Sequence, residues 1–138
     1  ANTLLETLNN FDELQSLSMP QDNAESCYAA KILKKEANID WSQSAQQIDR
    51  QIRAFNSWPV AQTLWQEKML RIWQATVLDS PNHTVKPGTI IQADRQGIDV
   101  ATGDGVIRLL SLQAPGKKAV PTNDFLNAHP LKAGDYFG

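Results

Sequence analysis

The stretch from Gly97 to Gln113 reads GIDVATGDGVIRLLSLQ, and it is the part of the chain that decides the fold class. Two runs of β-forming residues, Ile98–Ala101 and Val106–Gln113, lie on either side of Gly103-Asp104-Gly105. Glycine reaches the backbone conformations that tight turns need, and aspartate stabilises such turns through its own side chain. This arrangement therefore predicts an antiparallel hairpin.

Three further β-rich runs precede this hairpin, separated by turn signals. We expect strands at Thr63–Trp65, Leu70–Leu78 and Thr89–Ile91. The expected turns are Gln66–Lys68, Asp79–Asn82 and Asp94–Gly97. Five short strands with such punctuation predict a small antiparallel barrel or sandwich, so the fold class is α+β and mainly β.

Short helices are predicted on both sides of the strands. A helix should begin near Ser44, with Ser42 as the rival cap, because Gln47 follows Ser44 at the spacing of a capping box. It should end near Asn56–Pro59, since a residue before proline avoids the helical region. Its apolar face comprises Ala45, Ile48, Ile52 and Phe55. A second short helix is expected at Asn123–Ala128, after Pro121-Thr122.

The amino-terminal part has a different character. Leucine and phenylalanine recur at helical spacing over Thr3–Leu17 and predict an amphipathic helix whose apolar stripe needs a partner surface. Ser18–Asn23 reads as a break because it contains Pro20 and a polar cluster. Another short helix is expected within residues 28–37.

Composition is that of an ordinary soluble domain: 138 residues, 41% hydrophobic and 20% charged. No apolar stretch approaches the roughly 20 residues that span a bilayer, so we expect no membrane contact. Cys27 is the only cysteine, which favours a reducing, cytoplasmic location. Residues 1–30 hold five acids and no Lys or Arg, whereas residues 31–138 hold 13 bases and ten acids, a balance of 13 − 10 = +3. A mildly basic domain thus follows an acidic leader, and polyanion binding is permitted.

No catalytic or metal site is predicted from the residues. Cys27 and the two histidines, His83 and His129, show no pattern of a nucleophile with its base or of a zinc site. Gly116-Lys117 lacks the earlier glycine and the following hydroxyl residue of a phosphate loop. Asp104 is interpreted as a turn residue and not as a catalytic acid.

Nucleic-acid binding is the remaining candidate, because basic residues fall in three local groups. The candidate phosphate contacts are Lys34 and Lys35 (beside Lys31), Arg50 and Arg53, and Lys117 and Lys118. An ordinary solvated face is the alternative interpretation of these charges. The four tryptophans could stack on bases, but at their positions we expect them to fill the core.

Several motifs resemble the carboxy-terminal domain of methionyl-tRNA formyltransferases from Ile39 onward, in order and spacing. They are Ile39-Asp40-Trp41, the run Ile52–Pro59 (IRAFNSWP), Gly88–Ile91 (GTII), Gly97–Gly105, Leu110–Ala119 (LSLQAPGKKA) and Asp124-Phe125-Leu126. Residues 21–36 look like the interdomain linker of that family, and residues 1–17 look like the last helix of its Rossmann-like catalytic domain.

The resemblance implies an OB-like five-stranded antiparallel barrel with flanking short helices, and a role in gripping tRNA. It divides the chain into a terminal helix of a catalytic domain (1–17), an interdomain linker (18–38) and a tRNA-binding domain (39–138). The family's whole enzymes move a formyl group from 10-formyltetrahydrofolate to the amino group of methionyl-tRNA in translation initiation. Their catalytic residues and folate pocket lie in the amino-terminal domain, so this chain is expected to hold neither a catalytic residue nor a cofactor.

The implied partners are initiator methionyl-tRNA and the protein's own amino-terminal catalytic domain. A monomer is expected, with self-association through the amphipathic helix left open. The alternative is the carboxy-terminal module of a formyltransferase acting on sugar nucleotides or other small molecules. The paired Lys117 and Lys118 after Gln113 favour the tRNA branch. Ser57 departs from that branch, where proline is frequent, and Pro121 stands where a capping serine is common.

Overall fold

The computed structural model describes residues 2–79 and 83–138, and the chain divides into two compact units. Residues 1–31 form the first unit and residues 32–138 the second. The predicted turn Asp79–Asn82 lies largely outside the described residues, although the strand before it ends at Leu78 as expected. Among the described residues, no helix combines the length and apolarity needed to cross a membrane.

The first unit holds short helices whose residues are all exposed. They are α1 (Asn2–Asn9), α2 (Phe11–Ser16) and a 3₁₀ turn η1 (Asn23–Glu25). The single predicted helix over Thr3–Leu17 is therefore wrong in detail, because it is interrupted at Asn10. The side-chain amide of Asn10 donates to the Glu6 carbonyl at 3.1 Å. Such local bonds compete with the regular helical pattern.

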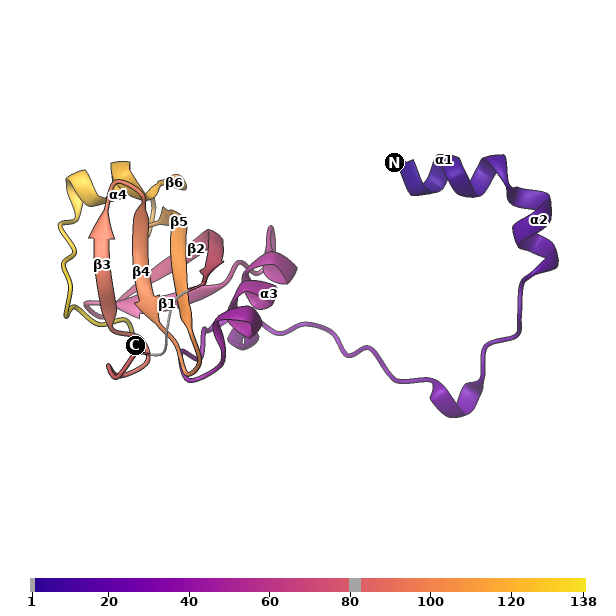
Figure 1. The fold of residues 1–138 in the computed structure, drawn as a ribbon, viewed down its shortest axis with the longest axis horizontal. Coiled ribbons are helices and arrows are strands. Elements are labelled where there is room, and N and C mark those ends of the chain that lie inside the picture. The colour runs from indigo at the N-terminus through magenta and orange to yellow at the C-terminus, as the bar shows by residue number, and fades with distance from the viewer. Residues whose placement is uncertain (1, 80–82) are drawn as a thin grey trace. The chain divides into compact units, whose positions relative to one another are not determined.

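The second unit is a mainly antiparallel sheet with short helices around it (Figure 1). In chain order its elements are η2 (Lys34–Ala37), α3 (Ala45–Phe55), β1 (Gln62–Trp65), β2 (Lys68–Leu78), β3 (Ile90–Asp94), β4 (Gly97–Ala101), β5 (Val106–Gln113), β6 (Val120–Pro121) and α4 (Thr122–Ala128). The helix expected within residues 28–37 is reduced to the four residues of η2. The other two predicted helices are confirmed, and Ser44 is the cap of α3, accepting from the Gln47 amide at 3.3 Å.

The central hairpin is confirmed with its predicted turn. Ile98 pairs with Leu109 and Ala101 with Val106 in antiparallel register. The turn joins the sheet to the start of α3, because the Asp104 carbonyl accepts from the Ala45 amide at 2.8 Å. Gly103 is required at this junction, since a Cβ there would lie 1.7 Å from the Ser42 carbonyl oxygen.

The sheet has six strands in the order β1-β2-β5-β4-β3, with β6 paired to β5. This corrects the predicted five-stranded barrel in two ways. The two-residue β6 was too short to predict, and across the described residues no ladder joins β1 to β3. The carboxy-terminal segment bonds to both edges instead: the Gly138 amide donates to Leu64 of β1, and the Asp135 carbonyl accepts from Ile90 of β3. These bonds satisfy edge groups that strand pairing would otherwise satisfy.

The core lies between the sheet and α3, with α4 over one end of the sheet (Figure 1). Ile48 and Ile52 of α3 are buried as predicted. The Trp41 indole is also buried and donates to the Thr63 hydroxyl at 3.0 Å. Trp65 is partly buried and packs edge-on against Phe125. Trp58 contradicts the expected role of the tryptophans, because it is 54% exposed.

Candidate nucleic-acid interface

Lys34 and Lys35 lie on η2, which is fixed against α3. The Gln51 side chain on α3 donates to the Glu36 carbonyl at 2.8 Å and to the Asn38 carbonyl at 3.1 Å. Ala37 is buried beneath this turn. Both lysines are exposed. Two flexible cations are thus carried on an anchored backbone, which is what a phosphate contact requires.

Arg50 and Arg53 are exposed on α3. Their guanidinium groups differ in ion pairing within the described residues. The Arg53 guanidinium donates to the Asp49 carboxylate at 2.9 Å, one turn earlier on the same helix. Such an exposed pair is weak, so Arg53 can exchange its partner for a phosphate at small cost.

Lys117 and Lys118 lie in the loop between β5 and β6, and Gln113 anchors this loop. The Gln113 side chain donates to the Lys117 carbonyl at 2.7 Å and accepts from the Trp73 indole at 2.9 Å. The loop and α4 enclose a cavity of about 310 Å³ that both lysine residues line. The glutamine that precedes the paired lysines in this motif therefore has a structural role: its side chain holds the loop that carries them.

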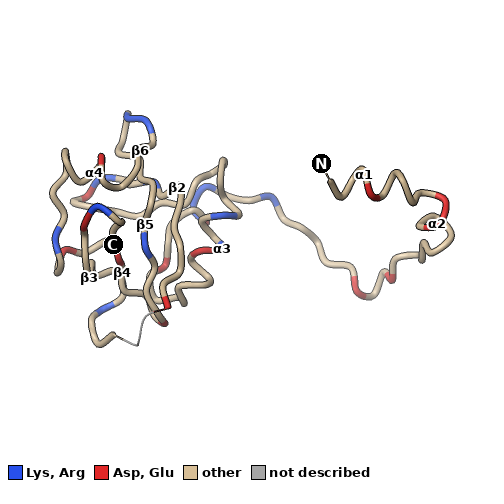
Figure 2. Tube along the Cα trace, turned by 45° about the horizontal axis from the view of Figure 1, so that its top comes forward, with Lys and Arg blue, Asp and Glu red and all other residues tan. Residues whose placement is uncertain are grey.

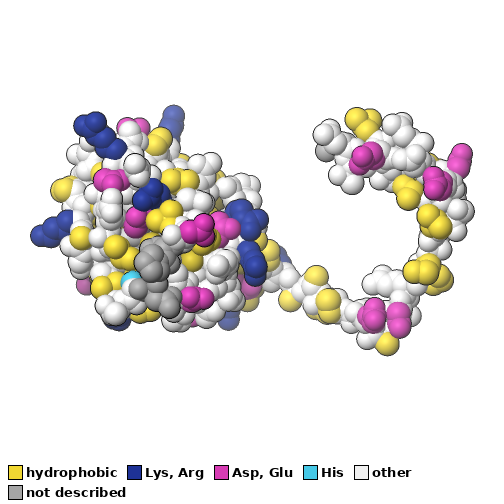
Figure 3. Space-filling view, viewed as in Figure 1, with side chains coloured by type: hydrophobic (Ala, Val, Ile, Leu, Met, Phe, Trp, Pro, Cys, Tyr) yellow, Lys and Arg dark blue, Asp and Glu magenta, His cyan; other side chains and the backbone are white. Residues whose placement is uncertain are grey.

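The six predicted cations form three groups and not one cluster. Figure 2 shows basic residues in the loop beside β6 and, separately, near α3 and on the segment leading into it. On the face in Figure 3, basic side chains alternate with acidic ones. Lys117 and Lys118 line one cavity together. Their joint role as phosphate contacts stays a prediction.

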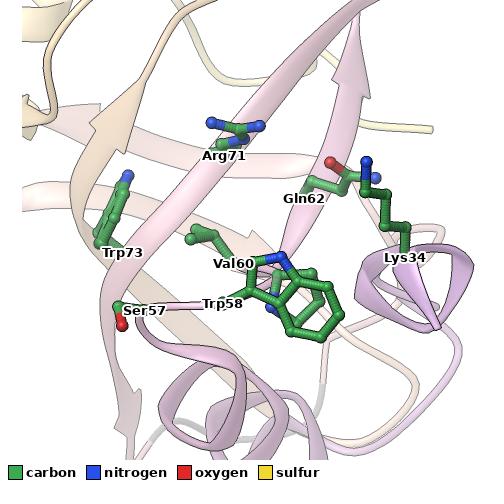
Figure 4. A pocket seen from close by; sticks show the side chains of 8 residues that line it. Lys34, Ser57, Trp58, Val60, Gln62, Arg71 and Trp73 are labelled. Atoms are coloured by element: carbon green, nitrogen blue, oxygen red, sulfur yellow. The ribbon is translucent and has the colours of Figure 1, made fainter. Parts of the chain in front are cut away.

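A second cavity of about 310 Å³ lies beside two of the tryptophans and includes one member of these groups (Figure 4). Lys34 lines it directly, and so does Trp73, the indole that Gln113 links to the Lys117 loop. Its other residues are Ser57, Trp58, Pro59, Val60, Gln62 and Arg71. None of these eight side chains is acidic, so the cavity carries positive charge from Lys34 and Arg71.

Sequence reasoning missed Arg71, although a signal was available. Leu70 and Ile72 are buried on β2 and Arg71 between them is exposed, as strand alternation requires. Gln113 is its partner in the ladder, which places Arg71 beside the base of the lysine loop. By contrast, Arg108 is engaged by Asp99 through two hydrogen bonds of 2.6 and 2.8 Å, and these bonds raise the pKa of Arg108. The Arg108 guanidinium is therefore already paired with a carboxylate of the neighbouring strand.

Comparison with known proteins agrees with this fold and these motifs. Residues 31–130 match the family described as formyl transferase, C-terminal domain. The chain therefore belongs to that family.

Among the relatives is the methionyl-tRNA formyltransferase of Nitrosococcus oceani, which is 46% identical over 135 residues. That alignment covers 97% of this chain and 42% of the relative. The methionyl-tRNA formyltransferase of Coxiella burnetii is 45% identical over 129 residues, covering 94% of this chain and 41% of the relative. The chain thus spans about two fifths of the length of these relatives.

A solved structure has a similar fold. HypX from Aquifex aeolicus, in complex with tetrahydrofolic acid, matches with a TM-score of 0.62 at 19% identity. The match covers 98% of this chain and 26% of that chain. At this level of identity the likeness concerns the fold alone.

Proposed function

We propose that this chain is the tRNA-binding, carboxy-terminal part of a methionyl-tRNA formyltransferase. Support comes from the family match over residues 31–130 and from relatives of that name at 46% and 45% identity. An OB-like character of the sheet domain belongs to this proposal, as does the division into residues 1–17, 18–38 and 39–138. The whole protein would act in the cytoplasm, as a monomer.

In this proposal the chain holds tRNA and another part of the protein performs the reaction. A separate amino-terminal domain would transfer the formyl group from 10-formyltetrahydrofolate to the amino group of initiator methionyl-tRNA. Lys34, Lys35, Arg50, Arg53, Lys117 and Lys118 would contact phosphates. Such contacts position an RNA without reading its sequence, so discrimination of the initiator would reside mainly in the other domain.

The observation that carries the proposal is the anchoring of the lysine loop. Gln113 fixes the Lys117 backbone to Trp73 while both lysine side chains stay exposed. Each neutralised phosphate contributes about −0.7 to −0.9 to the slope of log affinity against log salt. The double variant Lys117→Ala/Lys118→Ala should therefore make that slope less steep by about one to two units.

Filter binding of bulk tRNA at several salt concentrations measures this slope. The matched control is Arg95→Ala/Lys132→Ala, which removes two exposed cations outside the three groups. Equal slopes for the wild type and the lysine double variant would remove Lys117 and Lys118 from the contact surface. No salt-sensitive binding by a folded chain would instead favour a module of a formyltransferase that acts on sugar nucleotides or other small molecules.

A further inference from the structure

The cavity that contains Trp58 combines aromatic surface with positive charge. Its lining includes two indoles, Trp58 and Trp73, and two cations, Lys34 and Arg71. In Figure 4 the Arg71 side chain lies above the Trp58 indole, with Trp73 and Lys34 to either side. A volume of about 310 Å³ is at the small end of the range for ligand sites, on the order of 300–1,000 Å³.

The two indoles differ in burial and in hydrogen bonding. Trp73 is partly buried and its N–H is already bonded to Gln113, so Trp73 acts as a fixed wall. The Trp58 side chain leaves 54% of its surface exposed, although a tryptophan gains much by burial. Within the described residues neither Lys34 nor Arg71 forms a salt bridge, and an exposed indole beside such cations is a surface that a flat, anionic ligand can cover.

The backbone around the cavity is held in place on three sides. The Asn56 side-chain amide donates to the Trp73 backbone carbonyl at 3.1 Å, which ties the turn before Trp58 to β2. The Val60 amide donates to the Phe55 carbonyl at 2.9 Å and holds Val60 at φ 68°, a conformation that a β-branched residue rarely adopts. The Gln62 side chain donates to the Asn38 carboxamide oxygen at 2.8 Å and secures the segment after η2.

We propose that this cavity binds one unpaired nucleotide of an RNA strand, with the base stacked on Trp58 and the adjoining phosphate between Lys34 and Arg71. Aromatic side chains recognise unstacked bases in this way, whereas a paired base presents no free face. The cation pair supplies phosphate affinity and the indole supplies selectivity for single-stranded segments. This inference rests on the proposed tRNA-binding function and adds a defined contact point for a flipped-out or loop nucleotide.

Titration of the full chain with a single-stranded RNA heptamer tests the proposal, and a duplex of equal length is the comparison. Trp58→Ala should weaken heptamer binding about 5- to 150-fold, because base–aromatic stacking contributes about 1–3 kcal/mol by alanine substitution. Trp58→Phe should retain most of the affinity, since an aromatic face remains. Quenching of tryptophan fluorescence on binding should be reduced in both variants, because Trp73 remains in the cavity.

The matched control for the aromatic change is Tyr136→Ala, which removes another exposed ring outside this cavity. Arg71→Ala should make the salt slope less steep by about 0.7, with Arg95→Ala as the control for loss of an exposed cation. Thermal denaturation establishes that each variant is folded. Unchanged heptamer affinity in folded Trp58→Ala and Arg71→Ala would overturn the proposed site.

Parallel titrations with bulk tRNA separate the two proposals. Binding of tRNA that depends on Lys117 and Lys118 but not on Trp58 would overturn the nucleotide site and leave the proposed function standing. Heptamer binding that requires Trp58, without any binding of tRNA, would overturn the proposed function while retaining the cavity as a site for single-stranded RNA.

Discussion

The chain contains two amphipathic helical regions that share the helical spacing of apolar residues but differ in how far those residues are buried. In α3 the apolar residues Ile48 and Ile52 are 1% exposed. In α1 and α2 the apolar residues remain in solvent, and Leu8 is 59% exposed. Helical spacing of apolar residues therefore predicts a helix in both regions but predicts burial in neither. Burial requires a complementary surface, which the sheet supplies to α3.

The energetic difference between the two regions follows directly. Full burial of a leucine or isoleucine contributes about 1.5–3 kcal/mol. Many apolar side chains of residues 32–138 contribute in this way. The helices α1 and α2 must instead rely on local helix stability, which is marginal for helices of eight and six residues.

The largest expected effect is the difference in unfolding free energy between truncation of a buried leucine and truncation of an exposed one. Leu112→Ala should lower the free energy of unfolding by about 2–5 kcal/mol, since Leu112 is fully buried in the core. Leu8→Ala should change it by less than about 0.5 kcal/mol. Urea denaturation of the two variants measures both values. A comparable loss for Leu8→Ala would mean that the leader contributes to the same cooperative unit.

The next effect tests the junction that makes α3 part of the folded unit. Gly103→Ala places a methyl group 1.7 Å from the backbone oxygen of Ser42, so the loop before α3 must move. We expect a loss of about 3 kcal/mol, because the blocking atom belongs to the backbone. Gly116→Ala is the matched control: it meets open space at φ 69° and should cost only about 1 kcal/mol. Equal melting temperatures for the two variants would contradict this account.

Removal of residues 1–31 should change the stability of the remaining chain by less than about 0.5 kcal/mol. The reason is that none of the described residues in α1 and α2 is buried. Calorimetry of the full and shortened chains measures the difference. Hydrogen exchange adds a sharper criterion: amides of α1 and α2 should exchange rapidly in a dilute monomer. Strong protection there would show that the helices dock on their own folded unit, and protection that grows with concentration would show self-association.

The smallest effect concerns pH. Hydrogen bonds from Gln43 and Ser42 lower the pKa of Asp40 below its usual value of 3.8. A carboxyl whose folded-state pKa is depressed stabilises the fold fully above its unfolded pKa, and this contribution is lost as pH falls through the lower, folded value. The melting temperature of the wild type should therefore decrease slightly as the pH is lowered below 3.8. Asp40→Asn should reduce this dependence, whereas Asp12→Asn in the leader should not.

Much of the fold was predictable because its signals are local. The hairpin at Gly103–Gly105, the cap at Ser44 and the end of α3 before Trp58 depend on neighbours in sequence. The arrangement at the sheet edges was not predictable in this way. Across the described residues β1 and β3 do not pair, and the carboxy-terminal segment bonds to both edges, with Gly138 reaching Leu64 across more than half of the chain.

The candidate site shows the same division. Lys34 and Lys117 were identified as charged residues, but the contacts that place Trp73 between the Lys34 cavity and the Lys117 loop were not. That relation depends on Arg71 and Gln113 being partners on adjacent strands and on the bond between Gln113 and Trp73. The exposure of Trp58 was also missed, because a tryptophan in a strand-rich domain is usually part of the core.

The sequence by itself determined the family, the helices α3 and α4, five of the strands and the charged groups, since each is written in residues close together in the chain. Only the tertiary structure decided which apolar stripe is buried, how the sheet edges are satisfied and which cations share a cavity with an exposed indole. The physical reason is that burial and convergence are properties of surfaces brought together from distant segments, and local patterns carry no information on which surfaces meet.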